Sequence, residues 1–403
     1  MPHQRARHLL ALLEKRLQLF PIVGVLGARQ TGKSTLFRDL LPSQRSIHYV
    51  TLDREEIRSQ AQRQPTLFIR NLESSKYRTV CIDEVQKAPV LFDTLKAEVD
   101  ECKRPGRFAL SGSTEFSKKI GIQDALTGRI ALLRIYPLNQ SEIENRKPSY
   151  PCVDPFKVAT QKKVPTPKKL VPLKSTQMWL DRGGMPGIFA LRDTANRASL
   201  FESWIETSCA RDLARFEIPR FNPELARRIL IETAKAQIPN RTEISRSLGK
   251  IPRQIEAYFQ AFKALFILYE IEPYKTSVGK SNFYFFDAGL AEFVGASIER
   301  RLQVWFLNEC FSQFSYSGQR RPDIFVYQTH RGSRIDFVIT AKNTCYAVKL
   351  TDEEAPSTYT LRSVAAFRVK HPQIPVIVAA PCLYIQQPDA DSGVKIIPWS
   401  ALT

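Results

Sequence analysis

Residues 27–34 read GARQTGKS and match the pattern G-x-x-x-x-G-K-[ST]. The apolar stretch IVGVL precedes them and TLFRDLL follows, so the motif lies between an expected strand and an expected helix. Its glycines let backbone N–H groups turn toward phosphate oxygens, and the helix amino terminus adds a positive dipole. Lys33 can reach the β- and γ-phosphates, and the Ser34 hydroxyl can ligate Mg²⁺. The candidate phosphate-binding residues are Gly27, Ala28, Arg29, Gln30, Thr31, Gly32, Lys33, Ser34 and Thr35.

A pair of acidic residues follows the apolar stretch in TVCIDEVQ, at 79–86. Asp83 can hold the hydration shell of a magnesium ion that Ser34 also ligates. Glu84 can orient an attacking water and accept its proton, which hydrolysis requires and nucleotide binding alone does not. The acids and the loop together predict a nucleoside triphosphate with Mg²⁺ as ligands, and Glu84 and Lys33 as catalytic residues. Glu84 also argues against a small-molecule kinase.

Two shorter motifs add candidate residues near the ends of apolar stretches. In LSGST (110–114), Ser111 or Ser113 can hydrogen-bond the γ-phosphate or the water as a sensor, although an ordinary polar turn has the same composition. In LTGRI (126–130), Arg129 can pair within its own fold or reach the γ-phosphate of a neighbouring subunit as an arginine finger. We include Ser113 and Arg129 among the candidate catalytic residues.

Short β-branched stretches must position these residues. Their nearly continuous apolar character is typical of strands covered on both faces, as in a parallel sheet. Longer helical stretches separate them, and this alternation predicts a doubly wound α/β domain. The expected strands of this domain are 22–27, 46–52, 79–85, 107–113 and 130–135.

The composition divides the rest of the chain. Residues 145–175 are rich in proline and lysine without periodicity, which predicts a linker or an ordered surface excursion. Helical patterns then return, and after about residue 281 the strand signals resume in NFYFF, DIFVY, RIDFVI, CYAVKL, PVIVAA and VKIIPW. We therefore expect a P-loop parallel-sheet domain at 1–144, a helical and winged-helix region at 176–280, and a restriction-nuclease-like α/β domain at 281–403.

Residues 334–350, RIDFVITAKNTCYAVKL, contain part of a metal-dependent nuclease site. Restriction-type nucleases hold Mg²⁺ with one acid at a strand end and a second acid two residues before a lysine on the next strand. Asp336 and Lys349 fit that arrangement, and Glu309 lies on an earlier expected helix as a helper. Ala347 stands where the second acid belongs and has no oxygen to offer. The sequence therefore predicts a degenerate PD-(D/E)XK-like domain kept for binding or assembly.

Residues 240–274 are typical of a helix-turn-helix with a following hairpin. Thr242 can cap a short helix that Gly249 ends, and Pro252 suits the first turn of a longer helix. KTSVGKS then forms a candidate wing, which predicts a winged-helix fold. In DNA-binding versions the second helix enters the major groove, but Glu256 on its polar face repels phosphate. The better phosphate partners are Lys162, Lys163, Lys168, Lys169, Lys174, Lys275 and Lys280.

Composition and charge limit the classes of function. The formal charge is +19 with a pI near 9.7, which favours polyanions such as DNA, although a generally basic composition gives the same numbers. The 403 residues predict two or three soluble domains, and no apolar run approaches the ~18–20 residues of a membrane span. Seven scattered cysteines without a CxxC pair argue against disulfides and zinc, and predict a reducing, cytoplasmic location.

The motifs taken in order resemble those of prokaryotic AAA-type ATPases that join an AAA_14 domain to a C-terminal DUF4143 region. The resemblance covers nearly the whole chain except the proline- and lysine-rich stretch, and it implies ATP as the nucleotide and a sensor role for Ser113 or Ser111. The first motifs are generic to P-loop ATPases, whereas GGMPG and FFDAGL point to this family. The motifs are GARQTGKST, CIDEVQ, ALSGST, LTGRI, GGMPG (183–187), Arg211–Asp212 and FFDAGL (285–290).

Two hypotheses follow from these observations. The first is an ATPase whose nucleotide state rearranges a bound partner, either DNA or another protein. The second is a nucleotide-gated DNA-binding protein with an inactive nuclease-like domain, for which ATP acts as a switch. Assembly into a homo-oligomer is compatible with both, because an arginine finger would come from a second copy of the chain.

Overall fold

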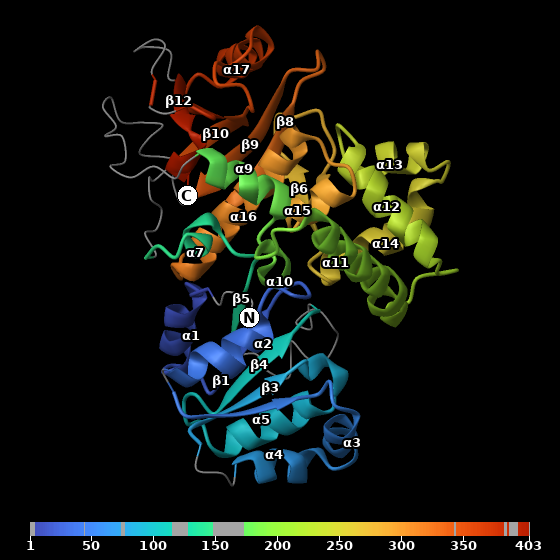
Figure 1. The fold of residues 1–403 in the computed structure, drawn as a ribbon, viewed down its shortest axis with the longest axis vertical. Coiled ribbons are helices and arrows are strands. Elements are labelled where there is room, and N and C mark those ends of the chain that lie inside the picture. The colour runs from blue at the N-terminus through green and yellow to red at the C-terminus, as the bar shows by residue number, and fades with distance from the viewer. Residues whose placement is uncertain are drawn as a thin grey trace.

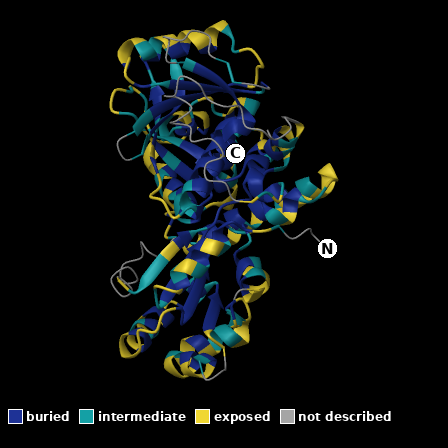
Figure 2. Ribbon diagram, turned by 90° about the vertical axis from the view of Figure 1, so that its left-hand side faces the viewer, coloured by how far each residue is buried: buried dark blue, intermediate teal, exposed yellow. Residues whose placement is uncertain are grey.

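The computed structural model describes residues 5–43, 45–73, 77–114, 128–147, 173–341, 344–382, 385–386 and 394–402. These residues form two sheets with a helical region between and beside them (Figure 1). One cluster of buried apolar side chains runs from Leu9 to Leu402 and joins the two halves. Figure 2 shows the buried residues concentrated in both sheets and in the long helix beside the second one.

The amino-terminal sheet is parallel, with strand order β2-β3-β4-β1-β5. Its strands are β1 (Ile22–Leu26), β2 (Ile47–Thr51), β3 (Thr79–Asp83), β4 (Phe108–Gly112) and β5 (Ile130–Arg134). Helices cover both faces, as expected for apolar strands that are buried on both sides (Figure 1). The predicted parallel α/β domain is therefore confirmed, and all five predicted strands are present within one or two residues.

In this half, α1 (Leu9–Leu17) precedes β1 in the chain, and the other described helices lie between the strands. These are α2 (Lys33–Thr35) with its continuation η1 (Leu36–Leu40) and η2 (Leu41–Ser43), α3 (Glu55–Arg63), α4 (Pro65–Glu73), the single turn η3 (Val85–Lys87) and α5 (Leu91–Glu101). In Figure 1, α3, α4 and α5 lie on one side of the sheet, and α1 and α2 on the other. The amino-terminal helix α1 is amphipathic and buries Leu9, Leu12, Leu13 and Leu17 against the domain.

The middle of the chain is helical. Asn240 rather than the predicted Thr242 caps α13, because the Asn240 side chain accepts a hydrogen bond from the Glu243 N–H at 3.0 Å. Gly249 adopts a positive φ of 62° just after α13, and Pro252 begins α14, both as predicted. The elements are α7 (Gln140–Ile143), α9 (Leu173–Arg182), α10 (Pro186–Phe189), α11 (Thr194–Thr207), η5 (Ser208–Asp212), η6 (Leu213–Arg215), α12 (Pro223–Lys235), α13 (Arg241–Ser247) and α14 (Pro252–Ala264).

The second sheet is mixed, with strand order β12-β11-β10-β9-β8-β6-β7. Its strands are β6 (Leu268–Pro273), β7 (Asn282–Phe285), β8 (Asp323–Gln328), β9 (Arg334–Ala341), β10 (Thr344–Leu350), β11 (Val376–Ala380) and β12 (Val394–Pro398). Its helical elements are α15 (Ala288–Phe293), α16 (Ile298–Tyr316), α17 (Thr358–Lys370) and η7 (Trp399–Leu402). Because β6 pairs with both β7 and β8, the division expected near residue 280 falls inside one continuous sheet.

The two family-like motifs in the carboxy-terminal two-thirds of the chain contact each other. Asp287 of FFDAGL caps α15 by accepting the Leu290 N–H at 2.9 Å, and its other carboxylate oxygen accepts the Gly184 N–H of GGMPG at 2.7 Å. A side chain on Gly183 would collide with Asp287, and one on Gly289 would collide with the Arg182 backbone. Both glycines are thus required by close approach, and the two motifs have a structural role.

None of the helices built from the described residues is both long enough and apolar enough to cross a membrane. Most of the predicted linker, including Lys162, Lys163, Lys168 and Lys169, lies outside the described residues.

Candidate nucleotide site

The glycine-rich loop leaves the carboxyl end of β1 and enters α2. Gln30 and Gly32 adopt positive φ values of 61° and 94°, which give the loop its tight curl. The Thr31 hydroxyl donates to the Ala28 carbonyl at 2.8 Å and fixes this curl from within. A side chain on Gly27 would collide with the Ile135 carbonyl oxygen, so glycine is required where the loop passes β5.

Lys33 is folded back into its own loop. Its ammonium group donates to the carbonyl oxygens of Gly27 at 3.0 Å and Ala28 at 2.8 Å. Burial lowers the pKa of Lys33, and the nearby carboxylates of Glu84 and Asp83 oppose that effect. The loop therefore brings this cation close to the acidic pair, while the ammonium group donates to two carbonyl oxygens of its own loop.

Asp83 ends β3 and is buried, yet both of its oxygens accept hydrogen bonds from uncharged groups. The Tyr49 hydroxyl donates to Oδ2 at 2.7 Å, the Glu84 N–H donates to Oδ1 at 3.1 Å, and the Ser111 hydroxyl also donates to Oδ1. Burial and the bond to Asp83 raise the pKa of Tyr49, whereas a hydrogen bond with Ser34 acts in the opposite direction. The Tyr49 hydroxyl thus links Asp83 to Ser34.

This arrangement fits a magnesium ion. Ser34 is exposed at the start of α2, and Asp83 provides a carboxylate that the same tyrosine hydroxyl reaches. Hydroxyl and carboxylate oxygens are the ligands that Mg²⁺ prefers. Ser34 is the residue that would hold the ion directly, and Asp83 would hold its hydration shell.

Glu84 leaves β3 in the left-handed conformation, with φ 59° and ψ 40°. Its Oε2 atom accepts hydrogen bonds from the Gln86 amide at 2.6 Å and the Ser113 hydroxyl at 3.2 Å. The Gln86 amide also donates to the Ser113 hydroxyl at 3.1 Å. Three side chains from the ends of β3 and β4 therefore form one closed hydrogen-bonded group around Glu84.

The two candidate sensor serines contact different acids. Ser111 is fully buried and contacts Asp83, whereas Ser113 is half-buried and contacts Glu84. Sequence reasoning did not identify Tyr49 or Gln86. Gln86 stands two residues after Glu84 in TVCIDEVQ, so its spacing offered a signal, but nothing marked Tyr49.

Arg129 lies away from this group within the same chain. It directly precedes β5, whose first residue Ile130 pairs with Ile22, the first residue of β1, whereas the glycine-rich loop follows the last residue of β1. Its guanidinium group forms a two-pronged ion pair with Asp100 at 2.7 and 3.0 Å. Arg129 therefore pairs within its own fold at the opposite edge of the sheet, and a role toward a neighbouring subunit stays a prediction.

The helical region contacts the loop through Arg29. The Arg29 guanidinium pairs with Asp212 at 3.1 Å, and the Trp204 indole N–H lies 3.5 Å from the Arg29 carbonyl oxygen. The Asp212 carboxylate also acts to raise the pKa of Lys33, against the effect of burial. The sequence placed Arg29 in the loop and Asp212 in a family-like pair, but gave no sign that the two residues meet.

A second contact joins the loop to the carboxy-terminal half. The buried Arg7 guanidinium donates to the Thr31 carbonyl at 2.6 Å, to Glu142 at 3.1 Å and to the Tyr316 hydroxyl at 3.0 Å. Burial alone would lower the pKa of Arg7, but Glu142 and Tyr316 outweigh it and raise the pKa. One arginine thus ties the phosphate loop to the last turn of α16.

The carboxy-terminal acid occupies a different environment. Asp336 on β9 accepts hydrogen bonds from the Gln303 amide at 2.7 Å and the Leu350 N–H at 2.7 Å, and its Oδ2 lies 3.2 Å from the Lys349 ammonium. Burial would lower the pKa of Lys349, but Asp336 and then Glu299 outweigh it and raise the pKa. Every oxygen of Asp336 is therefore already engaged.

Glu309, the predicted helper, does not join Asp336. Its carboxylate accepts the Gln140 N–H of α7 at 2.7 Å and the Gln313 amide at 3.1 Å. Besides Asp336, the carboxylate that approaches Lys349 belongs to Glu299 in the first turn of α16, at 3.8 Å. Within the described ranges, no three His, Cys, Asp or Glu side chains gather as a metal site.

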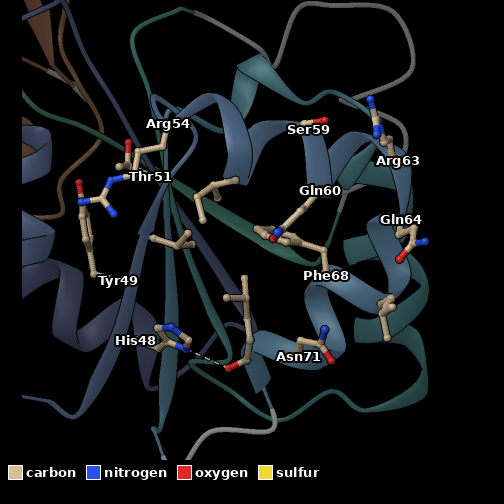
Figure 3. A pocket seen from close by; sticks show the side chains of 14 residues that line it. His48, Tyr49, Thr51, Arg54, Ser59, Gln60, Arg63, Gln64, Phe68 and Asn71 are labelled. Carbon is tan, nitrogen blue, oxygen red and sulfur yellow. Dashed lines mark hydrogen bonds between the residues drawn. The ribbon is translucent and has the colours of Figure 1, made fainter.

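A cavity of 720 Å³ opens beside the nucleotide site, between β2 and the helices α3 and α4 (Figure 3). Apolar side chains form part of its wall, and His48, Gln60 and Asn71 add polar groups. None of the predicted site residues lines it. The lining residues Tyr49 and Thr51 also meet Asp83, since the Tyr49 hydroxyl donates to its carboxylate and Thr51 of β2 pairs with Asp83 of β3.

Comparisons with known proteins agree with the first half of this description. Residues 19–144 match the family model AAA_14, described as an AAA domain. Those residues form a P-loop, ATPase-like domain. Residues 173–299 match DUF8612, a domain of unknown function, and not the DUF4143 region that the motifs had suggested.

Two curated relatives and one solved structure are also similar. The uncharacterized proteins Mb2031c of Mycobacterium bovis and Rv2008c of Mycobacterium tuberculosis are each 23% identical over 362 residues, which cover 86% of this chain and 74% of theirs. The Walker-type ATPase PABY2304 of Pyrococcus abyssi is 16% identical with a TM-score of 0.42, over 71% of this chain and 94% of that one.

Proposed function

We propose that the chain binds ATP with Mg²⁺ and hydrolyses it to ADP and phosphate. The observation that carries this proposal is the placement of Glu84, an acid without an ion-pair partner among the described residues, beside the loop that holds Lys33. The AAA_14 match over residues 19–144 supports the same activity. An acid able to accept a proton separates hydrolysis from nucleotide binding alone.

In this proposal, the residues of the loop and of the two strand ends have different roles in hydrolysis. The backbone N–H groups of the loop and the Lys33 ammonium bind the phosphates once Lys33 leaves its carbonyl partners. Mg²⁺ held by Ser34 and Asp83 neutralises phosphate charge when bound. Glu84 orients the water and accepts its proton as the new oxygen–phosphorus bond forms and the bond to the ADP oxygen breaks.

The same contacts provide a route from nucleotide state to the rest of the chain. Arg29 is paired with Asp212 in the helical region, and Arg7 joins the Thr31 carbonyl to Tyr316 on α16. Phosphate competes with Asp212 for Arg29, because both are anions that suit a guanidinium group. We propose that ATP binding weakens the Arg29–Asp212 contact and thereby moves the helical region against the ATPase-like domain.

Duplex DNA is the second candidate partner. Helices α12, α13 and α14 precede the β6–β7 hairpin, which is the element order of a winged helix, and Lys250, Arg253 and Lys280 are exposed around it. Acidic residues offset part of this charge, since Arg241 pairs with Glu256 at 2.7 Å. We therefore propose phosphate contact rather than base reading.

The carboxy-terminal sheet enters this proposal as a binding or assembly domain. The order α16, three antiparallel strands β8–β10, α17 and parallel β11 suits a nuclease-like core whose second acid is replaced by Ala347. No disulfide bond joins the described cysteines, and a cytoplasmic location is also part of the proposal.

Phosphate release from ATP, measured with and without duplex DNA and alongside molecular size in each nucleotide state, tests this function. We expect Mg²⁺-dependent turnover that Lys33→Ala abolishes. DNA binding should weaken with salt by about −0.9 in log–log slope for each phosphate neutralised. Absence of turnover in every condition would reject the ATPase, and absence of DNA binding at low salt would reject the second partner alone.

A further inference from the structure

We infer that Gln86 is a positioning residue for hydrolysis, which acts by holding the Glu84 carboxylate in the orientation needed to activate water. This inference rests on the proposed ATPase function and adds a residue to the same site. Gln86 belongs to the single turn η3 that directly follows the acidic pair, so it moves with Glu84 and not with the glycine-rich loop.

The hydrogen bonds define how the Gln86 amide is oriented. A carboxylate group only accepts hydrogen bonds, so the Gln86 NH₂ group must face Glu84, and it does so at 2.6 Å. The same NH₂ group donates to the Ser113 hydroxyl at 3.1 Å, which in turn donates to the same Glu84 oxygen at 3.2 Å. Both donors of the amide are therefore used inside this group of three side chains.

The carbonyl oxygen of the Gln86 amide, Oε1, does not determine this orientation. Gln86 Oε1 is buried and has no hydrogen-bond partner among the described residues. A buried acceptor without a partner is costly, so the amide is oriented for the benefit of Glu84 and not by its own oxygen. Cores normally avoid such an arrangement, and the exceptions concentrate at functional sites.

The arrangement leaves one oxygen of Glu84 for chemistry. Gln86 and Ser113 both contact Oε2, and no hydrogen bond to Oε1 is present among the described residues. Glu84 itself is held in the left-handed conformation with φ 59°. A fixed Oε2 directs Oε1 outward, where it can accept the proton of an attacking water. Loss of Gln86 would let the carboxylate rotate and would lower the fraction of time it is correctly aimed.

The test compares Gln86→Met in two backgrounds, because methionine keeps the length of the side chain and removes its hydrogen bonds. In the otherwise native chain we expect kcat for ATP to fall about 10- to 100-fold, the effect of losing a hydrogen bond to a charged group, with KM and direct ATP affinity within about twofold. In a Glu84→Gln background, the same change should cause almost no further fall, since Gln86 acts through Glu84. Gln64→Met, at an exposed glutamine after α3, is the matched control and should leave both parameters unchanged.

The outcomes separate this inference from the proposed function. If the native chain turns over ATP but Gln86→Met has native kcat, or lowers it equally in both backgrounds, Gln86 does not position Glu84. A fall in ATP affinity or in the thermal midpoint that accounts for the lost turnover would likewise overturn the inference and leave the ATPase proposal standing. If the native chain itself has no turnover under any condition, the proposed function fails and the inference fails with it.

Discussion

Two buried aspartates, Asp83 and Asp336, sit on strands of two different sheets, and they differ in the charge of the groups that contact them. Asp83 contacts a tyrosine hydroxyl, a serine hydroxyl and a backbone N–H, all of them uncharged. Asp336 contacts the Lys349 ammonium, with Gln303 and the Leu350 N–H filling its remaining positions. The same residue type therefore accepts hydrogen bonds from uncharged groups alone in one sheet and pairs with an ammonium group in the other.

Both aspartates are buried, so the charge of the contacting groups, and not burial itself, distinguishes a candidate site from a structural ion pair. A buried acid without a cation is costly to keep ionised, and such acids persist where a metal or a cationic group binds in function. A buried acid that has its lysine contributes to packing and offers no free oxygen to a metal. Ala347 completes this contrast, because it pairs with Val338 and Val376 and packs within the sheet where a second acid would be needed.

The largest expected effect is on kcat, from a change at the acidic pair that ends β3. Glu84→Gln keeps the shape of the side chain but removes the group that accepts the proton, so kcat should fall about 10²- to 10⁴-fold while ATP still binds. Glu101→Gln, an exposed change at the end of α5, is the control. Single-turnover phosphate release measures the effect, and a fall of less than twofold would show that Glu84 is not the base.

Breaking the Asp336–Lys349 ion pair of the second sheet should lower the stability of the fold and leave ATP turnover intact. Asp336→Ala leaves Lys349 buried without its nearest acid, which should lower the free energy of unfolding by about 3–5 kcal/mol. The double change Asp336→Ala with Lys349→Met should recover most of that loss. Denaturant unfolding and ATP turnover per folded chain are the two measurements. A tenfold loss of turnover in a folded Asp336→Ala protein would mean that the two regions do not act separately.

The pH dependence of the free energy of unfolding tests whether Glu309, on α16, is buried as described. Burial raises the pKa of Glu309 to about 7. A raised pKa means that the protonated form favours folding, so this contribution is full below the unfolded value and is lost as pH rises through about 7. Between pH 4.5 and 8 the free energy of unfolding of the native chain should fall relative to Glu309→Gln by up to about 3 kcal/mol. Parallel pH curves for the two proteins would contradict the burial argument.

The smallest effect concerns the contact between the loop and the helical region. Asp212→Asn removes an anion that competes with phosphate for Arg29, so ATP affinity should rise about two- to fivefold, as expected for a partly exposed ion pair. Glu206→Gln, an exposed change on α11, controls for lost charge in general. Titration with ATP at two salt concentrations measures it, and weaker binding in Asp212→Asn would oppose the competition that we propose.

The sequence predicted the first sheet well because its information is local. Glycines at fixed spacing and an apolar strand ending in two acids specify the elements and the chain positions of the candidate residues. Pairings between distant residues were not predictable: Tyr49 reaches Asp83, Arg29 meets Asp212, and Glu309 turns to α7 although its spacing suited Asp336. The continuity of the second sheet across residue 280 was not predictable for the same reason, since strand periodicity indicates a strand but not which sheet it joins.

Calorimetric titration of MgATP into three full-length proteins tests the central claim most directly: the native chain, Lys33→Ala and Asp336→Ala. The account predicts one site per chain, with affinity at least about tenfold weaker in Lys33→Ala, as for loss of a charged hydrogen-bond donor, and unchanged in Asp336→Ala. Native affinity in Lys33→Ala together with lost binding in Asp336→Ala would contradict it and would move the ligand site to the second sheet.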